Sequence, residues 1–350
     1  MKTKIKKITV NASKSYDILI GKGLLASAGD IFKERFSGKK IAIITDDKVD
    51  NLYGEKVLNS LKEKGFAVCK FTFPNGEKSK NIETYAQILS FLAKQEISRT
   101  DLIVALGGGV VGDIAGFSAS TFNRGVPYVQ IPTTLLAQID SSVGGKTAID
   151  LEEGKNLVGA FYQPSRVLCD IDTLSTLSQE EFNCGMGEGA KYAILDKNIF
   201  ELVNGEYDLT DLVYLCIDYK RKIVEQDEFE KGNRKLLNLG HTLAHGIEKL
   251  SGYTILHGSA VAMGLKLILL ASKKHGFIDQ TTLEKCIATI KKCVGEKNNI
   301  DCEYDIRDLL KVALLDKKRD GTFINLVMVR GIEDCTFERV EVDKLTEYFL

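Results

Sequence analysis

Hydrophobic and polar residues form two different patterns along the chain. Before residue 165, short apolar runs rich in β-branched residues are separated by amphipathic stretches. The runs predict strands at Lys40–Thr45, Ala67–Phe73, Asp101–Leu106 and Tyr128–Ile131, the stretches predict helices at Val49–Lys64 and Ile82–Gln95, and Met1–Val10 alternates as a half-buried strand does. Strands that alternate with helices in this way indicate βαβ units and a largely parallel sheet.

From about Thr173 onward the pattern is that of long helices. Apolar residues recur with a period near 3.6, and no proline interrupts them. These segments predict helices at Glu188–Val203, Leu209–Asp227, Lys235–Leu250, Gly258–Lys274 and Asp279–Val294, and only Phe323–Val329 has the pattern of a strand. We therefore predict an α/β domain over residues 1–172 and a helical domain over residues 173–350.

Composition narrows the classes of function. A chain of 350 residues with 44% hydrophobic and 27% charged residues is globular and long enough for two domains, which excludes intrinsic disorder and a fibrous fold. Lys and Arg number 47 against 48 Asp and Glu, so the net charge of -1 offers no broad attraction to nucleic acid or to an anionic membrane. Eight cysteines without a Cys-x-x-Cys pair, signal peptide or membrane-spanning run predict a reduced, cytoplasmic protein.

A glycine-rich turn follows the predicted strand Asp101–Leu106. Gly107–Gly112 satisfies G-x-G-x-x-G between a strand and a helix, where backbone amides and the helix N-terminus favour a pyrophosphate. No acidic residue stands at a strand end about 20 positions later, so a ribose partner must come from elsewhere, and Asp46 after the strand Lys40–Thr45 is a candidate. The alternatives are a glycine turn that serves only packing and an ordinary turn aspartate.

Two lysines and an amide lie beside later glycine turns. The segments Asp140–Lys146 and Glu153–Asn156 contain Lys146, Lys155 and Asn156, side chains suited to phosphate and hydroxyl groups. A solvated hairpin would have the same composition, because lysine beside glycine is common on surfaces.

Three of the four histidines fall in one short stretch. His241 and His245 are four residues apart and therefore share one face of a helix, and a turn that contains Gly252 lets His257 fold back beside them. A metal site is the leading interpretation, and structural histidines are the alternative. Spacing alone favours His241 with His245 but does not settle which two histidines bind.

Several blocks of sequence, read in chain order, carry a resemblance that covers nearly the whole chain. They are residues 75–80, 107–113, 124–126, 130–147, 154–156, 187–192, 234–245 and 256–258. Together they resemble the 3-dehydroquinate synthase family of sugar-phosphate cyclases. The resemblance implies an N-terminal α/β Rossmann-like NAD-binding domain, an all-α C-terminal metal-binding domain, an active site in the interdomain cleft, and a homodimer. The implied reaction converts 3-deoxy-D-arabino-heptulosonate 7-phosphate to 3-dehydroquinate and phosphate.

The resemblance also implies the roles of individual residues. Zinc or cobalt would be held by Glu188, His241 and His257, which replaces the pair that spacing favours, and His245 would face the substrate phosphate. The implied NAD contacts are Asp46, Glu77, Lys80, Gly108, Gly109, Val110, Val111, Gly112, Asp113, Thr133, Thr134, Lys146 and Lys155. The implied substrate contacts are Asp140, Lys146, Asn156, Lys191, Lys220, Arg234, Asn238 and His245, with Arg124 reaching a phosphate of the neighbouring subunit and either Lys317 or Lys318 as a further phosphate contact. Arg234 with Lys220 suits a carboxylate, since a guanidinium grips both oxygens.

Two departures from the family pattern keep rival functions open. The segment 187–191 has small residues where the family often has bulkier apolar ones, and Ser259 stands where glutamate is usual. The rival enzymes are a sister cyclase that makes an inosose or valiolone and a metal- and NAD-dependent polyol dehydrogenase. Arg234 with Lys220 speaks against a sister cyclase, whose substrates lack the carboxylate. A catalytically silent NAD-binding scaffold is the non-enzymatic alternative.

Overall fold

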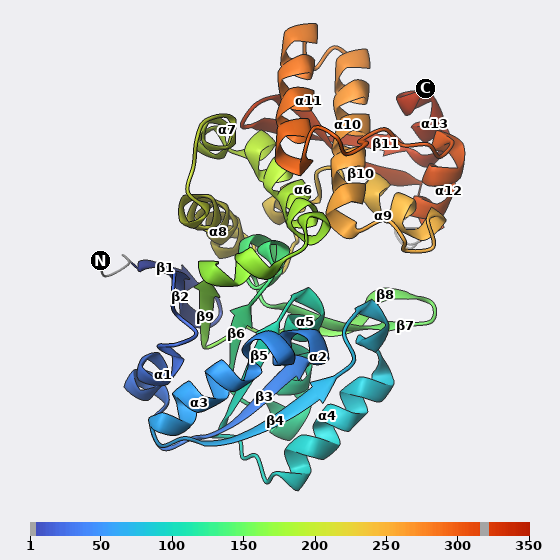
Figure 1. Cartoon of the computed structure of the whole chain (residues 1–350). Helices are drawn as coiled ribbons and strands as arrows, with labels where there is room; N and C mark the ends of the chain where they lie inside the picture. Colours follow the sequence, from blue (N-terminus) through green and yellow to red (C-terminus); the bar gives the residue numbers. More distant parts are fainter. Residues whose placement is uncertain (1–4, 316–321) are drawn as a thin grey trace. The chain divides into compact units, whose positions relative to one another are not determined.

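The computed structural model describes residues 5–315 and 322–350 (Figure 1). They form two compact units: one runs to Leu177 and includes Lys220–Glu228, and the other contains Ser178–Tyr219 and Phe229–Leu350. The first unit is α/β and the second is mainly helical, as the sequence predicts. The predicted boundary between residues 172 and 173 stays a prediction. Within the described residues, no helix has both the length and the hydropathy of a membrane span.

A seven-stranded sheet in the order β1-β2-β9-β6-β5-β3-β4 organises the first unit. β1 and β2 are antiparallel, and the other neighbours are parallel. The strands are β1 (Lys6–Asn11), β2 (Ser15–Gly21), β3 (Lys40–Asp46), β4 (Ala67–Phe73), β5 (Leu102–Gly107), β6 (Tyr128–Pro132) and β9 (Arg166–Asp170). A separate hairpin joins β7 (Lys146–Leu151) to β8 (Gly154–Phe161). The strands predicted in β1 and β3–β6 are confirmed.

Side chains of the central strands alternate between two apolar cores. In β3, Ile41 and Ile43 pack with α1 (Ala28–Phe36) and α3 (Glu55–Glu63), whereas Ala42 and Ile44 pack with α4 (Ile82–Lys94) and α5 (Gly109–Thr121). β5 is buried along its whole length. Because helices cover both faces, the strands read as continuous apolar runs, which is typical of a parallel sheet.

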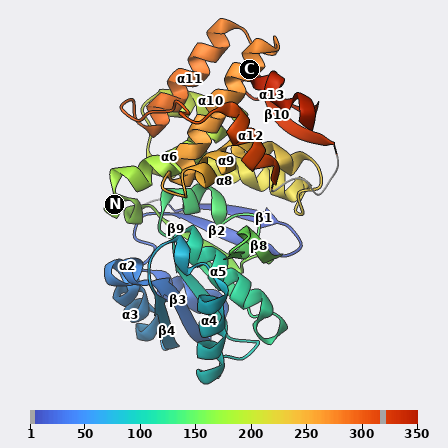
Figure 2. The same ribbon diagram turned by 90° about the vertical axis from the view of Figure 1, so that its right-hand side faces the viewer.

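The central helix of the second unit is α10 (His257–Lys274). It packs against α6, α9, α11 and β10 (Figures 1 and 2). Its other helices and strands are α6 (Gln179–Leu195), α7 (Lys197–Asn204), α9 (His241–Leu250), α11 (Gln280–Val294), α12 (Ile306–Leu315), β10 (Phe323–Gly331), β11 (Asp334–Glu341) and α13 (Leu345–Phe349). α8 (Leu209–Gln226) begins in this unit, and its part from Lys220 onward belongs to the first unit. The predicted strand Phe323–Val329 is confirmed as β10, and β11, which pairs with it, adds a hairpin to the helical unit.

Two of the predicted helices are wrong at their boundaries. The segment Glu188–Val203 is divided between α6, which already begins at Gln179 behind a Ser178–Glu181 capping box, and α7, whose first amides are capped by the Asp196 side chain. The segment Lys235–Leu250 starts as a 3-10 turn and becomes α-helical only at His241, after Gly240 with φ +79°. Local capping and one left-handed residue therefore override a continuous apolar period.

Candidate active site

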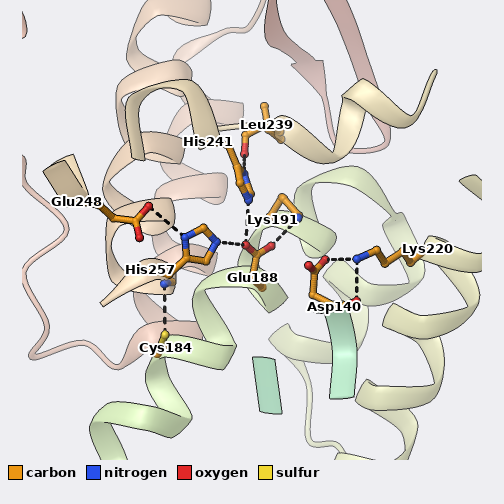
Figure 3. Close-up of polar contacts among 10 residues, drawn as sticks. Asp140, Cys184, Glu188, Lys191, Lys220, Leu239, His241, Glu248 and His257 are labelled. Atoms are coloured by element: carbon orange, nitrogen blue, oxygen red, sulfur yellow. Dashed lines mark hydrogen bonds and ion pairs between the residues drawn. The ribbon is translucent and has the colours of Figure 1, made fainter. Parts of the chain in front are cut away.

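Three side chains from three helices converge in the second unit (Figure 3). The Oε1 atom of Glu188, on α6, lies 3.1 Å from Nε2 of His241 and 3.1 Å from Nε2 of His257, the first residues of α9 and α10. One ligand atom from each residue lies within 4.8 Å of the other two. Ligand bonds of ~2.0–2.2 Å suit such a set, and three protein ligands leave a position for substrate, as in catalytic zinc sites. This donor set therefore fits a divalent ion.

Glycines allow the three helices to approach so closely. A Cβ atom on Gly187 would lie 2.0 Å from the carbonyl oxygen of Gly258, and one on Gly258 would lie 1.7 Å from that of Cys184. On the other side of α10, a Cβ on Gly264 would lie 2.3 Å from the carbonyl oxygen of Gly240. α10 thus meets α6 and the start of α9 backbone to backbone, and this contact explains the small residue at position 187.

Charged neighbours set the electrostatics of this cluster. Glu188 is 1% exposed, and Lys191 pairs with its second oxygen, Oε2. Burial favours the neutral carboxyl, but Lys191 and His241 hold the pKa of Glu188 well below its usual range. Burial likewise disfavours the charged His257, but hydrogen bonds with Glu188 and Glu248 raise its pKa to about 10. The cluster therefore contains an ionised Glu188 carboxylate beside the Lys191 ammonium group.

The third histidine lies beside this set. The His245 ring centroid is 5.8 Å from that of His241 and 6.2 Å from that of His257. Its donor atom forms a second group with Glu248 and His257, and no such group in the described part of the chain contains both His241 and His245. The two histidines that spacing favours therefore lie near each other but do not share such a group, because the carboxylate on α6 faces His241 and His257.

The glycine turn of the first unit lies between β5 and α5, as predicted. Gly108 is the N-cap of α5, and a Cβ there would lie 3.2 Å from Cγ2 of Thr134. The amide of Thr133 donates to the carbonyl of Gly107 at 3.0 Å. A Cβ on Gly112 would lie 2.9 Å from Oε1 of Gln130. The turn, with Val110 and Val111 in the first turn of α5, thus lies beside both threonines that the sequence analysis assigns to NAD.

A buried lysine joins several other predicted NAD and substrate residues. Lys80 pairs with Oδ2 of Asp113 at 2.6 Å and donates to Oδ1 of Asn156 at 2.5 Å. Burial disfavours its charge, but Asp113 raises the pKa of Lys80 above its ordinary value. Nearby in sequence, Lys155 pairs with Glu77 at 3.5 Å.

The sequence analysis missed Asp150. Its amide donates to the Lys80 carbonyl at 2.8 Å, and its Oδ1 accepts from the Asn156 amide at 2.7 Å. Asp150 thus holds Asn156, whose φ is +58°, beside Lys80. It lies between two family blocks, and only the pairing of β7 with β8 could have indicated it.

The other predicted residues of the first unit are more dispersed. Asp46 is buried at the end of β3, and its Oδ1 accepts a hydrogen bond from the Val49 amide at 2.9 Å. This is the contact of an ordinary turn aspartate, and the ribose contact of Asp46 stays a prediction. Asp140 pairs with Lys220 at 3.0 Å through Oδ1, and Lys220 also donates to the Asp140 carbonyl at 2.7 Å (Figure 3). Lys146 is exposed at the start of β7, and Arg124 is exposed with φ +63°.

In the second unit, Arg234 is 2% exposed, and Asn238 donates to Oε1 of Glu230 at 2.7 Å. Arg234 and Lys220, the predicted carboxylate pair, belong to different units. Lys317 and Lys318 lie outside the described residues.

Comparison with known structures shows the fold. 2-Deoxy-scyllo-inosose synthase, complexed with carbaglucose-6-phosphate, NAD+ and Co2+, superposes with a TM-score of 0.88 at 22% identity and covers 98% of this chain and 99% of its own. 2-Epi-5-epi-valiolone synthase from Streptomyces hygroscopicus, with NAD+ and Zn2+ bound, has a TM-score of 0.86 at 25% identity and 98% coverage of each chain. The architecture is thus that of the sugar-phosphate cyclases.

Comparison of sequences is more specific. The 3-dehydroquinate synthase of Clostridium acetobutylicum is 46% identical over 343 residues, which are 95% of this chain and 96% of the relative. That of Streptococcus suis is 42% identical, with 98% and 99% coverage. The family models described as 3-dehydroquinate synthase N-terminal and C-terminal match residues 70–184 and 185–319. With these matches and the residues gathered in each unit, the chain belongs to the 3-dehydroquinate synthase family.

Proposed function

We propose that this chain converts 3-deoxy-D-arabino-heptulosonate 7-phosphate to 3-dehydroquinate and phosphate, as a phosphate-eliminating carbon–oxygen lyase. The reaction proceeds by transient oxidation, loss of phosphate, reduction and intramolecular aldol closure, so NAD is not consumed. The Glu188, His241 and His257 cluster carries the proposal, because it supplies the ion site that this chemistry needs in a chain 46% identical to a relative of that name. The predicted interdomain active site and the homodimer are part of the proposal.

When bound, NAD would supply reversible hydride transfer with the carbon that bears a substrate hydroxyl, and a divalent ion would supply Lewis-acid polarisation of substrate hydroxyls. Glu188, His241 and His257 would hold the ion. For NAD, the Gly108–Asp113 turn presents backbone amides at the N-terminus of α5 to the pyrophosphate. Lys80, kept charged by Asp113, adds a fixed cation beside Asn156.

Fixed charges would orient the substrate. The guanidinium of Arg234 is buried and suits bidentate binding of the substrate carboxylate. Lys220 is anchored by Asp140, which limits the motion of its ammonium group before substrate binds. His245 is exposed on α9 beside His257 and is assigned to proton transfer near the phosphate. Arg124 is assigned to a phosphate bound by the neighbouring subunit.

The test is phosphate release from the heptulosonate phosphate with NAD and zinc or cobalt, followed with absorbance at the NADH maximum. A synthase releases phosphate without lasting NADH absorbance, whereas a polyol dehydrogenase accumulates NADH. Sugar phosphates that lack the carboxylate distinguish a sister cyclase, which would prefer them. Binding of NAD and metal without phosphate release from any of these substrates would indicate a silent scaffold, and a monomeric mass in solution would contradict the homodimer.

A further inference from the structure

A second carboxylate, that of Glu248, lies beside the ion cluster, which consists of the side chains of Glu188, His241 and His257. The proposed function gives Glu248 no role. Glu248 is near the end of α9 and is only 5% exposed. Its Oε2 atom lies 3.3 Å from Nδ1 of His257 (Figure 3). A glutamate is almost never fully buried unless it is paired, so this contact needs an explanation.

The two ring nitrogens of His257 face different carboxylates. Nε2 lies 3.1 Å from Glu188, and Nδ1 faces Glu248. His241 differs, because its Nδ1 lies 3.2 Å from the backbone carbonyl of Leu239. An imidazole that offers the Nε2 lone pair to a metal carries its proton on Nδ1, and the partner of that proton fixes both the tautomer and the ring orientation. One histidine of the cluster therefore has a neutral outer partner, and the other has an anionic one.

The turn after α9 holds Glu248 in place. Its carbonyl accepts from Oγ of Ser251 at 2.8 Å and from the amide of Tyr253 at 2.8 Å, and Tyr253 has φ +62°. This turn returns the chain so that His257 begins α10 beside the Glu248 side chain. The turn thus fixes the main chain at Glu248, from which the side chain reaches Nδ1 of His257.

Charge explains why an anion is useful at this point. Glu188 is the single carboxylate among the three donors, and the adjacent Lys191 ammonium offsets its charge. Glu248 adds a second negative charge one imidazole away from the ion position. A carboxylate that accepts from a ligand histidine also increases the basicity of that ligand.

We propose that Glu248 is a positioning residue, which accepts a hydrogen bond from Nδ1–H of His257, directs Nε2 toward the ion, and strengthens ion binding through its charge. The inference rests on the proposed function only in that it requires the divalent ion. Glu248 touches neither substrate nor NAD in this assignment, so the expected effect is on metal affinity.

The experiment measures zinc affinity by competition with a chromogenic chelator in the unaltered chain and in Glu248→Gln. The amide keeps the shape and can still accept from Nδ1–H, so the variant removes the charge. We expect affinity to fall by roughly 10–100-fold, the usual effect of losing an outer partner, and the visible spectrum of the cobalt form to change. Glu284→Gln is the matched control, because Glu284 is exposed on α11 and accepts a hydrogen bond from Gln280. The zinc affinity of this variant should equal that of the unaltered chain.

Three results would overturn the inference. Equal affinity in Glu248→Gln and the unaltered chain would show that the charge is irrelevant. A Glu248→Gln protein that fails to fold without metal would show that Glu248 serves the fold alone. The same conclusion would follow if the substitution lowered the free energy of unfolding equally in the metal-free and in the zinc-loaded protein. Two ions per unaltered chain, with the second lost in the variant, would make Glu248 a ligand of the His245, Glu248 and His257 group. Absence of any ion binding by the unaltered chain would instead refute the ion site of the proposed function.

Discussion

A single methyl group at the crossing of α6 and α10 should disrupt the ion cluster. In Gly187→Ala the new Cβ would lie 2.0, 2.5 and 2.8 Å from the O, C and Cα atoms of Gly258, all of them backbone. Ordinary contact begins near 3.4 Å, so the two helices must move apart by roughly 1.4 Å at this point. Glu188 follows Gly187 on α6, and His257 precedes Gly258 on α10, so the displacement acts directly on two of the three donors.

The magnitude follows from the tolerance of metal bonds. Ligand distances hold within about 0.2 Å, so a shift of roughly 1 Å removes either Glu188 or His257 from the ion. We expect zinc affinity to fall by more than ~100-fold, beyond the loss of an outer partner. The free energy of unfolding of the metal-free protein should fall by about 1–3 kcal/mol from overpacking, partly offset by ~1 kcal/mol from the better helix propensity of alanine.

Gly189→Ala on the same helix is the matched control. A Cβ there has its nearest neighbours, the Cε and Sδ atoms of Met186, at 3.6 Å, which is ordinary contact with a flexible side chain. Zinc affinity should not change, and the free energy of unfolding should rise by ~0.5–1 kcal/mol. Chelator competition and urea denaturation of both variants make the comparison. Equal zinc affinity in the two variants would refute the argument that the glycine contact assembles the cluster.

Other changes test the site residue by residue. His257→Ala should abolish metal binding and turnover together, whereas His245→Ala should keep the metal and slow phosphate release, as metal analysis and a phosphate assay would show. Lys80→Met should lower the free energy of unfolding by ~3 kcal/mol, since it leaves Asp113 without its partner, and should weaken NAD binding in a fluorescence titration; Lys78→Met, at an exposed position, should do neither. Chelation should lower the melting temperature, because an ion at 100 times its Kd stabilises by about 2.7 kcal/mol. With the ion removed by chelator, the pKa of His257 in the folded protein is about 10, above the ordinary 6.5. Protonated His257 therefore contributes fully to the free energy of unfolding below about pH 6.5, and this contribution is lost as the pH rises toward 10. Urea denaturation over this pH range measures the loss.

The α/β half was largely predictable from the sequence. Ile41, Ala42, Ile43 and Ile44 are apolar because the two faces of β3 meet two cores, and such a buried run can be recognised without knowing its neighbours. The helical half was predicted less well at its helix ends. The Asp196 cap and the left-handed Gly240 interrupt segments whose apolar period continues, and they also determine where His241 begins its helix.

The sequence alone determined the periodic elements and the glycine turn between β5 and α5, and through family resemblance it predicted Glu188, His241 and His257 as the three donors. Their meeting was decided by tertiary structure. Glu188 is remote in sequence from His241 and His257, and the three come together because Gly187, Gly258, Gly240 and Gly264 let α6, α9 and α10 touch through their backbones. The contacts of Glu248 and Asp150 were likewise decided by tertiary structure. Periodicity reports which face of one element is buried, and it carries no information about which other element arrives at that face.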